Sequence, residues 1–324
     1  MPRIITIILL SILLVPLSHA DNNKNQIKTI VKMRANVGPN YYQQLVTRAL
    51  LATSDSHGEF EIRLTPKKFP AKRLIEEVRK AKQLNLYTVP ATYKIIGDDP
   101  LIAIPIPLLQ GISGFRIPII HNNQIERFKN ISTLDDLKRI TIGQATGWAD
   151  IEIYEANNLH VKSAPYESLY ALTNIGRIDT LLLGAEQVEA SLMKRKERYP
   201  NLVIDDSTLV YYPLPVFFFV SKKEPELAER LRIGLEALIV SGEMKDLFNE
   251  HFEERLNALN IENRQLIRLN NPYLIDGIPF ERKELWFPTS KALNGEPPKL
   301  DFSGPTTPED TLKGKLTSFV ARAN

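Results

Sequence analysis

The first twenty residues constrain this chain most, because they decide in which compartment it has to fold. Arg3 precedes an almost wholly apolar run from Ile4 to Leu17, and Ser18-His19-Ala20 places small residues one and three positions before a break. A basic tip, a short apolar core and a small-x-small site are the three parts of a secretory signal peptide. The apolar run is shorter than the roughly 20 residues of a membrane-spanning helix. We therefore expect cleavage before Asp21 and export, with an uncleaved membrane anchor as the alternative.

Composition limits what an exported chain of this kind can use for stability and binding. Its 324 residues include no cysteine, which excludes disulfides, a lipid-modified cysteine and thiolate sites. The length favours two domains. Without Arg3, the 41 basic residues become 40 against 38 acidic ones, about +2, which is too near neutral to indicate nucleic acid or an anionic membrane as partner. We expect a soluble monomer that rests on its apolar core.

Strand and helix signals alternate along the chain, which favours an α/β fold. Alternating or β-branched runs predict strands at 26–33, 60–64 and 84–89, and helical spacing predicts helices at 41–53 and from Pro70 onward. A β-α-β-α-β order is typical of a mostly parallel sheet covered by helices. The same rhythm returns later, with strands predicted at 139–143, 161–164, 178–183 and 202–204, and helices at 148–157, 166–175 and 185–198.

Two long apolar segments marked by proline predict a hinge. These are Ile102–Leu109 and Leu209–Ser221, and prolines fit strands only at edges or bends. We interpret them as two strands that connect two lobes, each a mostly parallel sheet flanked by helices. The predicted boundaries are 1–20 for the signal peptide, 21–109 with 210–287 for lobe one, 110–209 for lobe two, and 288–324 for a tail of Pro, Gly, Ser, Thr and Lys without stable structure.

The segment Gly143-Gln144-Ala145-Thr146-Gly147-Trp148 is a candidate anion site. It reads as a strand, a glycine-containing turn and a helix start. Free amides at a helix start, together with the Thr146 hydroxyl, suit a carboxylate. Its two glycines do not form the dinucleotide fingerprint, and no Gly-Lys-Ser/Thr phosphate loop is present. A plain tight turn before a helix is the alternative.

Further candidates flank the hinge and the predicted lobe two. Arg116 follows the first hinge segment, where a guanidinium can fork onto a carboxylate, with a structural salt bridge as the alternative. Tyr41, Tyr42 and Trp148 are candidates for aromatic walls of a binding site, and core packing is the alternative for each. For Arg177, a structural role in its helix-to-strand turn is favoured, with Asp179 pairing or capping locally.

No constellation of catalytic or metal-binding residues stands out. None of the histidines beyond the signal segment, at 57, 121, 160 and 251, lies at helical metal-ligand spacing from another. There is no Gly-x-Ser-x-Gly nucleophile elbow, and no carboxylate pair is singled out as acid and base. We therefore predict neither an enzyme nor a metal or organic cofactor.

Several stretches of the second half carry a family resemblance. They are TGWADIEIYEANNLHV, GRIDTLLLGAEQVEA and YYPLPVFFFVS, all within Leu134–Ser221, followed by the two closing helices of Pro225–Phe252. In this order they resemble the bacterial extracellular solute-binding proteins of family three, the polar amino-acid type. The resemblance covers residues 26 to 287 and is that of a divergent member.

The resemblance implies two α/β lobes that close on a small ligand in the periplasm. In such proteins the lobe-two helix start, here near Thr146, helps to hold the ligand carboxylate. An arginine of the first lobe near the hinge also binds that carboxylate, and Arg116 is the nearest match. Amino-acid binders often place an aspartate for the ligand ammonium where this chain has Gly184, and Glu186 follows two residues later. This departure argues against an α-amino acid as the ligand, while an amino-acid-like solute stays among the expected ones.

The functional prediction is a periplasmic solute-binding protein. It would capture a small polar or anionic, amino-acid-like solute between its lobes and deliver it to the membrane permease of an ABC-type importer. The alternative is a periplasmic sensor or accessory protein that passes a ligand signal to a membrane signalling partner and transports nothing. The candidate ligand-binding residues are Arg116, Gln144, Thr146, Gly147, Trp148, Tyr41, Tyr42 and Glu186.

Overall fold

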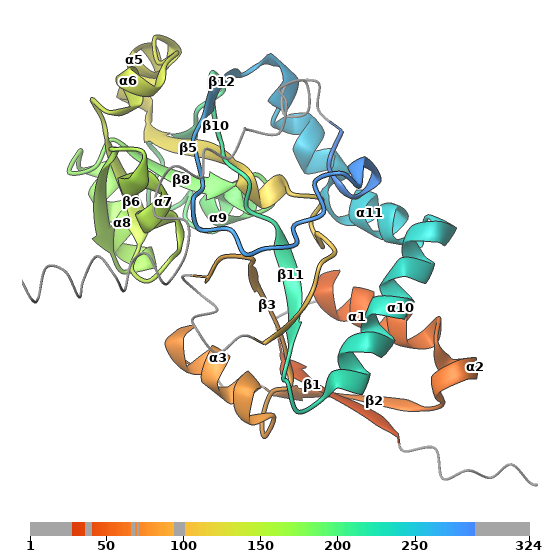
Figure 1. The fold of residues 1–324 in the computed structure, drawn as a ribbon. Coiled ribbons are helices and arrows are strands. Elements are labelled where there is room, and N and C mark those ends of the chain that lie inside the picture. The colour runs from red at the N-terminus through yellow and green to blue at the C-terminus, as the bar shows by residue number, and fades with distance from the viewer. Residues whose placement is uncertain (1–27, 36–40, 66–68, 70, 94–100, 289–324) are drawn as a thin grey trace, which may run out of the picture.

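A computed structural model describes residues 28–35, 41–65, 69, 71–93 and 101–288. The described chain folds into two α/β lobes, with β1 to β3 in one and β5 to β8 in the other (Figure 1). The predicted signal peptide and the predicted tail after residue 288 lie outside the described residues. Among the described helices, none combines the length and apolar content that crossing a bilayer requires.

Lobe one is built on two small sheets. Strands β1 (Thr29–Arg34) and β2 (Phe60–Thr65) pair in parallel, and β11 (Val216–Val220) lies between β3 (Leu86–Pro90) and β4 (Ile102–Ile104), antiparallel to both. Asn85 joins the two sheets, because its backbone and side chain bond the Lys32 carbonyl and amide at 2.9 and 2.7 Å. The helices are α1 (Tyr41–Leu51), α2 (Ser54–His57), α3 (Ala71–Lys80) and α10 (Pro225–Ser241).

Lobe two is built on one larger sheet in the order β12-β10-β5-β8-β6-β7, with β9 beside β5. All of its strands run parallel except β5, which is antiparallel to β8, β9 and β10. The strands are β5 (Phe115–His121), β6 (Thr141–Ala145), β7 (His160–Ala164), β8 (Thr180–Gly184), β9 (Leu202–Ile204), β10 (Thr208–Tyr211) and β12 (Gln265–Arg268).

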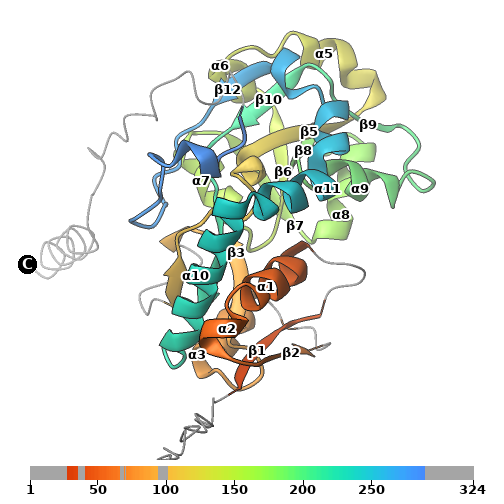
Figure 2. The same cartoon turned by 90° about the vertical axis from the view of Figure 1, so that its right-hand side faces the viewer.

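Short helices cover this sheet, and a long one leads back to it from lobe one. They are α5 (Ile125–Lys129), α6 (Leu134–Leu137), α7 (Asp150–Ala156), α8 (Tyr166–Asn174), α9 (Val188–Met193) and α11 (Glu243–Ala258). Figure 2 shows α11 between α10 of lobe one and the sheet of lobe two. Short 3-10 turns lie at η1 (Ile112–Gly114), η2 (Asn122–Gln124), η3 (Ile261–Asn263) and η4 (Lys283–Leu285).

The two predicted hinge segments lie side by side. In β4 and β11, Ile104 pairs with Phe218, and further along the Leu108 amide donates to the Val216 carbonyl at 2.9 Å. The first crossover then touches the second at Gly114, where a Cβ would stand 2.1 Å from the Tyr212 carbonyl oxygen. Only glycine permits this approach. The predicted α/β class with two lobes and adjacent hinge strands is confirmed.

The segment that follows α11 crosses between the lobes again, which the sequence did not indicate. Strand β12 pairs with β10 in lobe two, although residues 210–287 were all predicted to lie in lobe one. The following segment returns through hydrogen bonds from Asn157 to Asn270, from Ile275 to Ala91 and from Phe287 to Gln110, and through an Arg282–Glu236 ion pair. Residues 269–288 thus tie lobe two, lobe one and the first crossover together.

Candidate functional site

Buried polar atoms without a partner single out one region. Among the described residues, five such side-chain atoms occur, and they are Thr92 Oγ1, Arg116 Nε, Gln144 Nε2, Asn174 Oδ1 and Glu186 Oε2. Three of the five belong to residues predicted as ligand-binding. An unsatisfied buried polar atom costs about 1–3 kcal/mol. Arg116, Gln144 and Glu186 therefore keep two donors and one acceptor that no hydrogen bond among the described residues uses.

The sheet of lobe two brings these three side chains to one face. Arg116 of β5 pairs with Gly184 of β8, and Ile142 of β6 pairs with Thr180 of β8. Because side chains alternate along a strand, Arg116, position 184 and Gln144 point to the same side. On this side lies α7, whose Asp150 and Tyr154 are one helical turn apart and face the sheet.

Arg116 is held in a buried polar cluster. Its guanidinium forms an ion pair with Asp150, and both residues are only 3% exposed. The Tyr212 hydroxyl donates to the same Asp150 oxygen and contacts the Tyr154 hydroxyl at 3.1 Å, while the Tyr212 ring lies 5.3 Å from the Arg116 guanidinium carbon. Gln144 lies beside the Tyr154 hydroxyl. Arg116 is thus paired by an acid of its own lobe.

Electrostatics keep this arginine charged. Burial alone lowers the pKa of the Arg116 guanidinium, but the attraction of Asp150, with smaller contributions from Tyr212 and Glu186, outweighs burial and leaves the pKa above its ordinary value. Burial raises the pKa of Tyr212 well above its ordinary value, so its hydroxyl stays protonated and can donate to Asp150.

Glu186 folds back over Gly184. A Cβ built on Gly184 would lie 2.2 Å from Glu186 Oε2, so the carboxylate occupies the place that a side chain at 184 would take. Its other oxygen, Oε1, accepts from the Ser113 hydroxyl at 3.3 Å. Burial raises the pKa of the Glu186 carboxyl, and nearby Arg116 opposes this only in part.

Lobe one contributes Tyr42 to the same region. Burial raises the pKa of the Tyr42 hydroxyl well above its ordinary value, and the charge of Glu186 raises it further. A residue at the start of α1 therefore lies within electrostatic range of the loop after β8, across the boundary between the lobes. We call this set the junction cluster; it comprises Tyr42, Ser113, Arg116, Gln144, Asp150, Tyr154, Glu186 and Tyr212.

The turn after β6 forms a second group at the carboxyl end of the sheet. Thr146 and Gly147 are exposed, and Trp148 is half-buried and stacks on Tyr166 with 5.5 Å between ring centres. The Thr146 amide donates to the Ala164 carbonyl, and its hydroxyl contacts Ser163 at 2.8 Å. The prediction of a free helix-start amide at Thr146 is wrong. The β6–β7 pairing continues through Thr146 and occupies its amide, and α7 begins only at Asp150.

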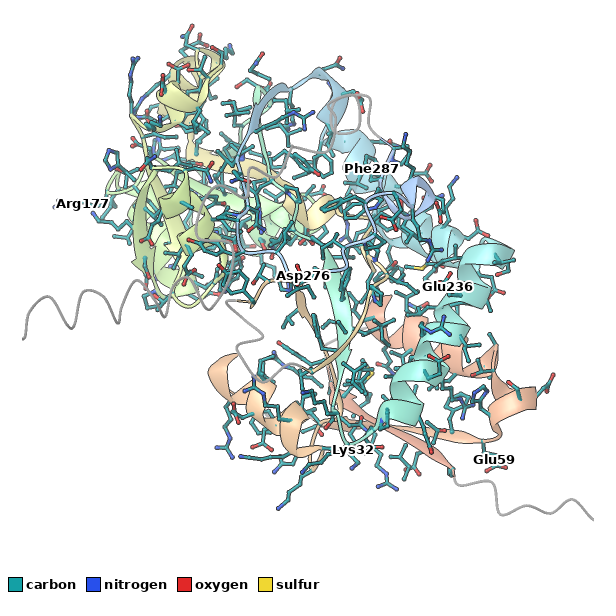
Figure 3. The ribbon with its side chains drawn as sticks, viewed as in Figure 1. Lys32, Glu59, Arg177, Glu236, Asp276 and Phe287 are labelled. Atoms are coloured by element: carbon teal, nitrogen blue, oxygen red, sulfur yellow. The ribbon has the colours of Figure 1, made fainter. Side chains whose placement is uncertain are left out.

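Two other predicted residues lie elsewhere. Tyr41 is buried in lobe one, with its hydroxyl donating to the Leu108 carbonyl at 2.6 Å and its ring against Phe252. Arg177 is exposed at the outer edge of lobe two (Figure 3). Asp179 does not pair locally, because it accepts from the Thr141 amide at 2.7 Å and pairs with Arg127 at 2.6 Å, 38 and 52 residues earlier in the chain.

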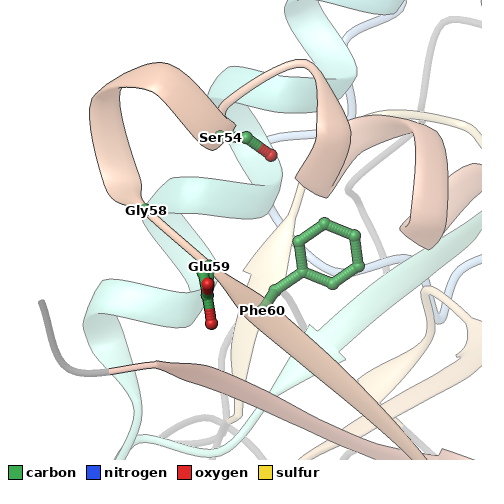
Figure 4. A pocket seen from close by; sticks show the side chains of 4 residues that line it. All are labelled: Ser54, Gly58, Glu59 and Phe60. Atoms are coloured by element: carbon green, nitrogen blue, oxygen red, sulfur yellow. The ribbon is translucent and has the colours of Figure 1, made fainter.

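Two cavities lie away from the junction cluster. One of about 370 Å³ is formed by Ser54, Gly58, Glu59 and Phe60 beside α2 (Figure 4). The other, of about 240 Å³, lies at the amino end of β8, between η2 and the turn after α8. Within the described ranges, no group of three His, Asp or Glu side chains is placed to hold a metal ion.

Sequence reasoning missed four members of the junction cluster, Asp150, Tyr154, Ser113 and Tyr212. A signal was present for the first two, because their spacing of four residues places both on one face of a helix that starts after the glycine turn. Tyr212 lies in the proline-marked run and shares a strand face with the buried Val210. What the sequence could not indicate is that Tyr212 meets Asp150, since 62 residues separate them.

No protein-family model matches the sequence, and no curated protein is significantly similar to it. Solved structures of similar fold include an ancestral arginine-binding protein bound to arginine (14% identity, 69% of this chain and 99% of the other, TM-score 0.49). Others are the GluR0 ligand-binding core with L-glutamate (12%, 70% and 98%, 0.49) and an arginine-specific periplasmic binding protein of Salmonella typhimurium (13%, 69% and 99%, 0.48).

Proposed function

We propose that this chain is a periplasmic solute-binding protein that holds a small polar solute at the junction cluster. The observation that carries this proposal is the set of three unused polar atoms on Arg116, Gln144 and Glu186, next to the boundary where Tyr42 approaches from lobe one. In open α/β sheets, ligands bind outside the carboxyl ends of the strands, and Glu186 follows the carboxyl end of β8 directly.

The solute should carry a hydrogen-bond donor, best an ammonium group. Glu186 offers an acceptor oxygen, and its raised pKa reflects a burial cost that a cationic partner would offset. The donors of Arg116 and Gln144 suit a carbonyl, hydroxyl or carboxyl oxygen of the same solute. An amino-acid-like or amine-bearing solute can use both the acceptor and the donors. The carboxylate of an amino-acid-like solute would find no free arginine, because Asp150 already pairs with Arg116.

Two lobes joined by neighbouring crossovers give such a solute a means of capture. Lobe motion about a few residues of adjacent strands is a common hinge arrangement. A solute that contacts both Tyr42 and Glu186 binds the closed arrangement better than an open one, so it stabilises closure by its differential affinity.

A thermal-shift screen of the purified chain against amino acids, amines, organic acids and short peptides tests this function. A compound that binds only the folded protein raises its melting temperature by mass action. Glu186→Gln should strongly reduce the shift of the hits, whereas Glu189→Gln, a matched change three residues later in α9, should leave it unchanged. A screen without any hit, or hits indifferent to Glu186→Gln, would contradict the proposal.

We further propose that the partner is the permease of an ABC-type importer and not a membrane signalling protein. Deletion of the gene should then reduce uptake of a radiolabelled hit by cells, and re-expression should restore it. Unchanged uptake together with a changed transcriptional response to the same hit would favour the sensor alternative.

A further inference from the structure

We propose that Asp150 determines which charge the solute carries: by pairing with Arg116 it leaves Glu186 as the one unpaired charge of the junction cluster, so that the site selects cationic solutes and rejects purely anionic ones. This inference rests on the proposed function and deepens it. It runs against the anionic solute that the sequence allowed, where Arg116 was the candidate anchor for a ligand carboxylate.

The geometry shows that Arg116 is already occupied. Its guanidinium is paired with Asp150, faces the Tyr212 ring at 5.3 Å, and belongs to a side chain that is 3% exposed. Its Nε is buried and has no hydrogen-bond partner among the described residues. A bidentate grip on a solute carboxylate needs two adjacent guanidinium nitrogens, and one of the outer nitrogens is committed to Asp150. A solute carboxylate would have to displace an acid that the fold holds in place.

Counting charge gives the same result. The ionisable groups in electrostatic contact with Glu186 include one cation, Arg116, and one other acid, Asp150. Arg116 and Asp150 cancel, so the cluster with Glu186 ionised carries about one net negative charge. Charges at a buried site interact far more strongly than in water. A cationic group therefore gains attraction there, and a dianion meets repulsion without a free arginine to offset it.

A purely structural role is the rival explanation for Asp150. It lies in the first turn of α7, where an acidic side chain is favourable to any helix. The two roles differ in what they predict for binding. A helix-stabilising Asp150 affects the melting temperature and leaves the charge preference of the site alone, whereas a specificity-determining Asp150 changes that preference.

The test uses three five-carbon probes of matched length, which are cadaverine as dication, 5-aminopentanoate as zwitterion and glutarate as dianion, alongside the hits of the wider screen. Their affinities are measured by calorimetry for the unmodified chain, for Asp150→Asn and for the double variant Arg116→Met with Asp150→Leu. Asp150→Asn leaves Arg116 to neutralise Glu186, so the net charge falls to zero. The double variant removes both partners, keeps the net negative charge, and should fold, because buried ion pairs can be replaced by apolar residues.

We expect every compound that binds the unmodified chain to carry an ammonium or guanidinium group. Asp150→Asn should weaken these compounds tenfold or more and narrow the preference for cadaverine over glutarate. The double variant also loses the Arg116 Nε donor, so it should bind the same compounds less tightly than the unmodified chain but keep the preference for cadaverine over glutarate. Binding of glutarate or another pure anion to the unmodified chain would overturn the inference and leave the proposed function standing. So would loss of that preference in the double variant, because the charge selection would then not come from Glu186.

The failure of the proposed function has a different signature. In that case no probe and no library compound binds the unmodified chain or either variant, although all three unfold cooperatively. Should Asp150→Asn fail to fold, the double variant alone decides: a preference for cadaverine over glutarate that persists without Arg116 and Asp150 supports Glu186 as the selecting charge, and loss of that preference contradicts it.

Discussion

Arg116 and Arg230 are both buried arginines, at 3% and 1% exposure, but their surroundings differ. Arg230 of α10 forms no ion pair with a carboxylate of the described residues and donates to two threonine hydroxyls and four backbone carbonyls, at 2.7 to 3.3 Å. Arg116 has an acid as partner and keeps Nε unused. One arginine has all its nitrogens bonded by neutral groups of the fold, and the other retains a free donor.

This difference separates a structural arginine from a functional one. The carbonyls of Leu50, His57, Gly58 and Glu59 all converge on Arg230, so it closes the turn that carries α1 through α2 to β2. Burial lowers the pKa of the Arg230 guanidinium, and the fold accepts this cost to satisfy those carbonyls. At Arg116 the fold instead supplies the Asp150 carboxylate as a counter-charge and leaves Nε without a hydrogen-bond partner.

The largest effect is expected for Arg230→Lys. One ammonium cannot reach acceptors spread around a planar guanidinium, so several carbonyls lose their donor inside lobe one. We expect a loss of about 4–5 kcal/mol of unfolding free energy, measured by urea denaturation. Arg232→Lys is the matched control, because that neighbouring arginine is exposed and pairs only with Glu229. Equal stability of the two variants would show that Arg230 is not a structural clamp.

A smaller loss is expected for Arg116→Met, about 3 kcal/mol. It leaves Asp150 buried without its cation, which usually costs about 3–5 kcal/mol, but the Tyr212 hydroxyl still donates to the carboxylate. Adding Asp150→Leu should recover most of the loss. Denaturation of both single variants and the double variant gives the coupling energy, and additive losses would contradict a coupled pair.

Arg116 also shows how much of the candidate site can be predicted from the sequence. Its place after the hinge predicted a binding residue, and the register of β5 against β8 brings it to the lobe junction. Its partner could not be predicted, because Asp150 approaches from a helix that starts 34 residues later. Local patterns identify strands, helices and hinge prolines, since these depend on neighbours in sequence, but ion pairs across a sheet depend on topology.

The errors at the fold level have the same origin. Strand β5 is continuously apolar around Arg116 and Pro118, so neither alternation nor helical spacing marked it. Strand β12 has only four residues and gains its place by pairing with β10. At Thr146, glycine correctly indicated a turn, but the continued pairing with β7 that occupies the amide has no local sequence signal.

Glu186 should make stability depend on pH, with an effect on the order of 1 kcal/mol or less. Burial raises the pKa of its carboxyl above the ordinary value of 4.5, with Arg116, Asp150 and Tyr42 as the neighbouring ionisable groups. The folded state therefore binds the proton more tightly than the unfolded one, and the stabilisation is lost as pH rises through the raised pKa. Melting temperatures of the unmodified chain and Glu186→Gln should agree near pH 4 and diverge toward pH 8, with Gln the more stable. A constant difference would show that Glu186 does not titrate in this window.

The smallest effect on stability and a large one on binding are expected for Gly184→Ala. The backbone of Gly184 is not in the left-handed region, so alanine brings no backbone strain, and the stability change should stay within about 1 kcal/mol. Its methyl group, however, needs the space of the Glu186 carboxylate, 2.2 Å from Oε2. Displacing that carboxylate should weaken solute binding tenfold or more, measured by calorimetry with a hit of the thermal-shift screen.

The control is the same change in a Glu186→Ala background. There it should have no further effect on affinity, because the group that it displaces is gone. A second, independent loss would mean that Gly184 contacts the solute directly.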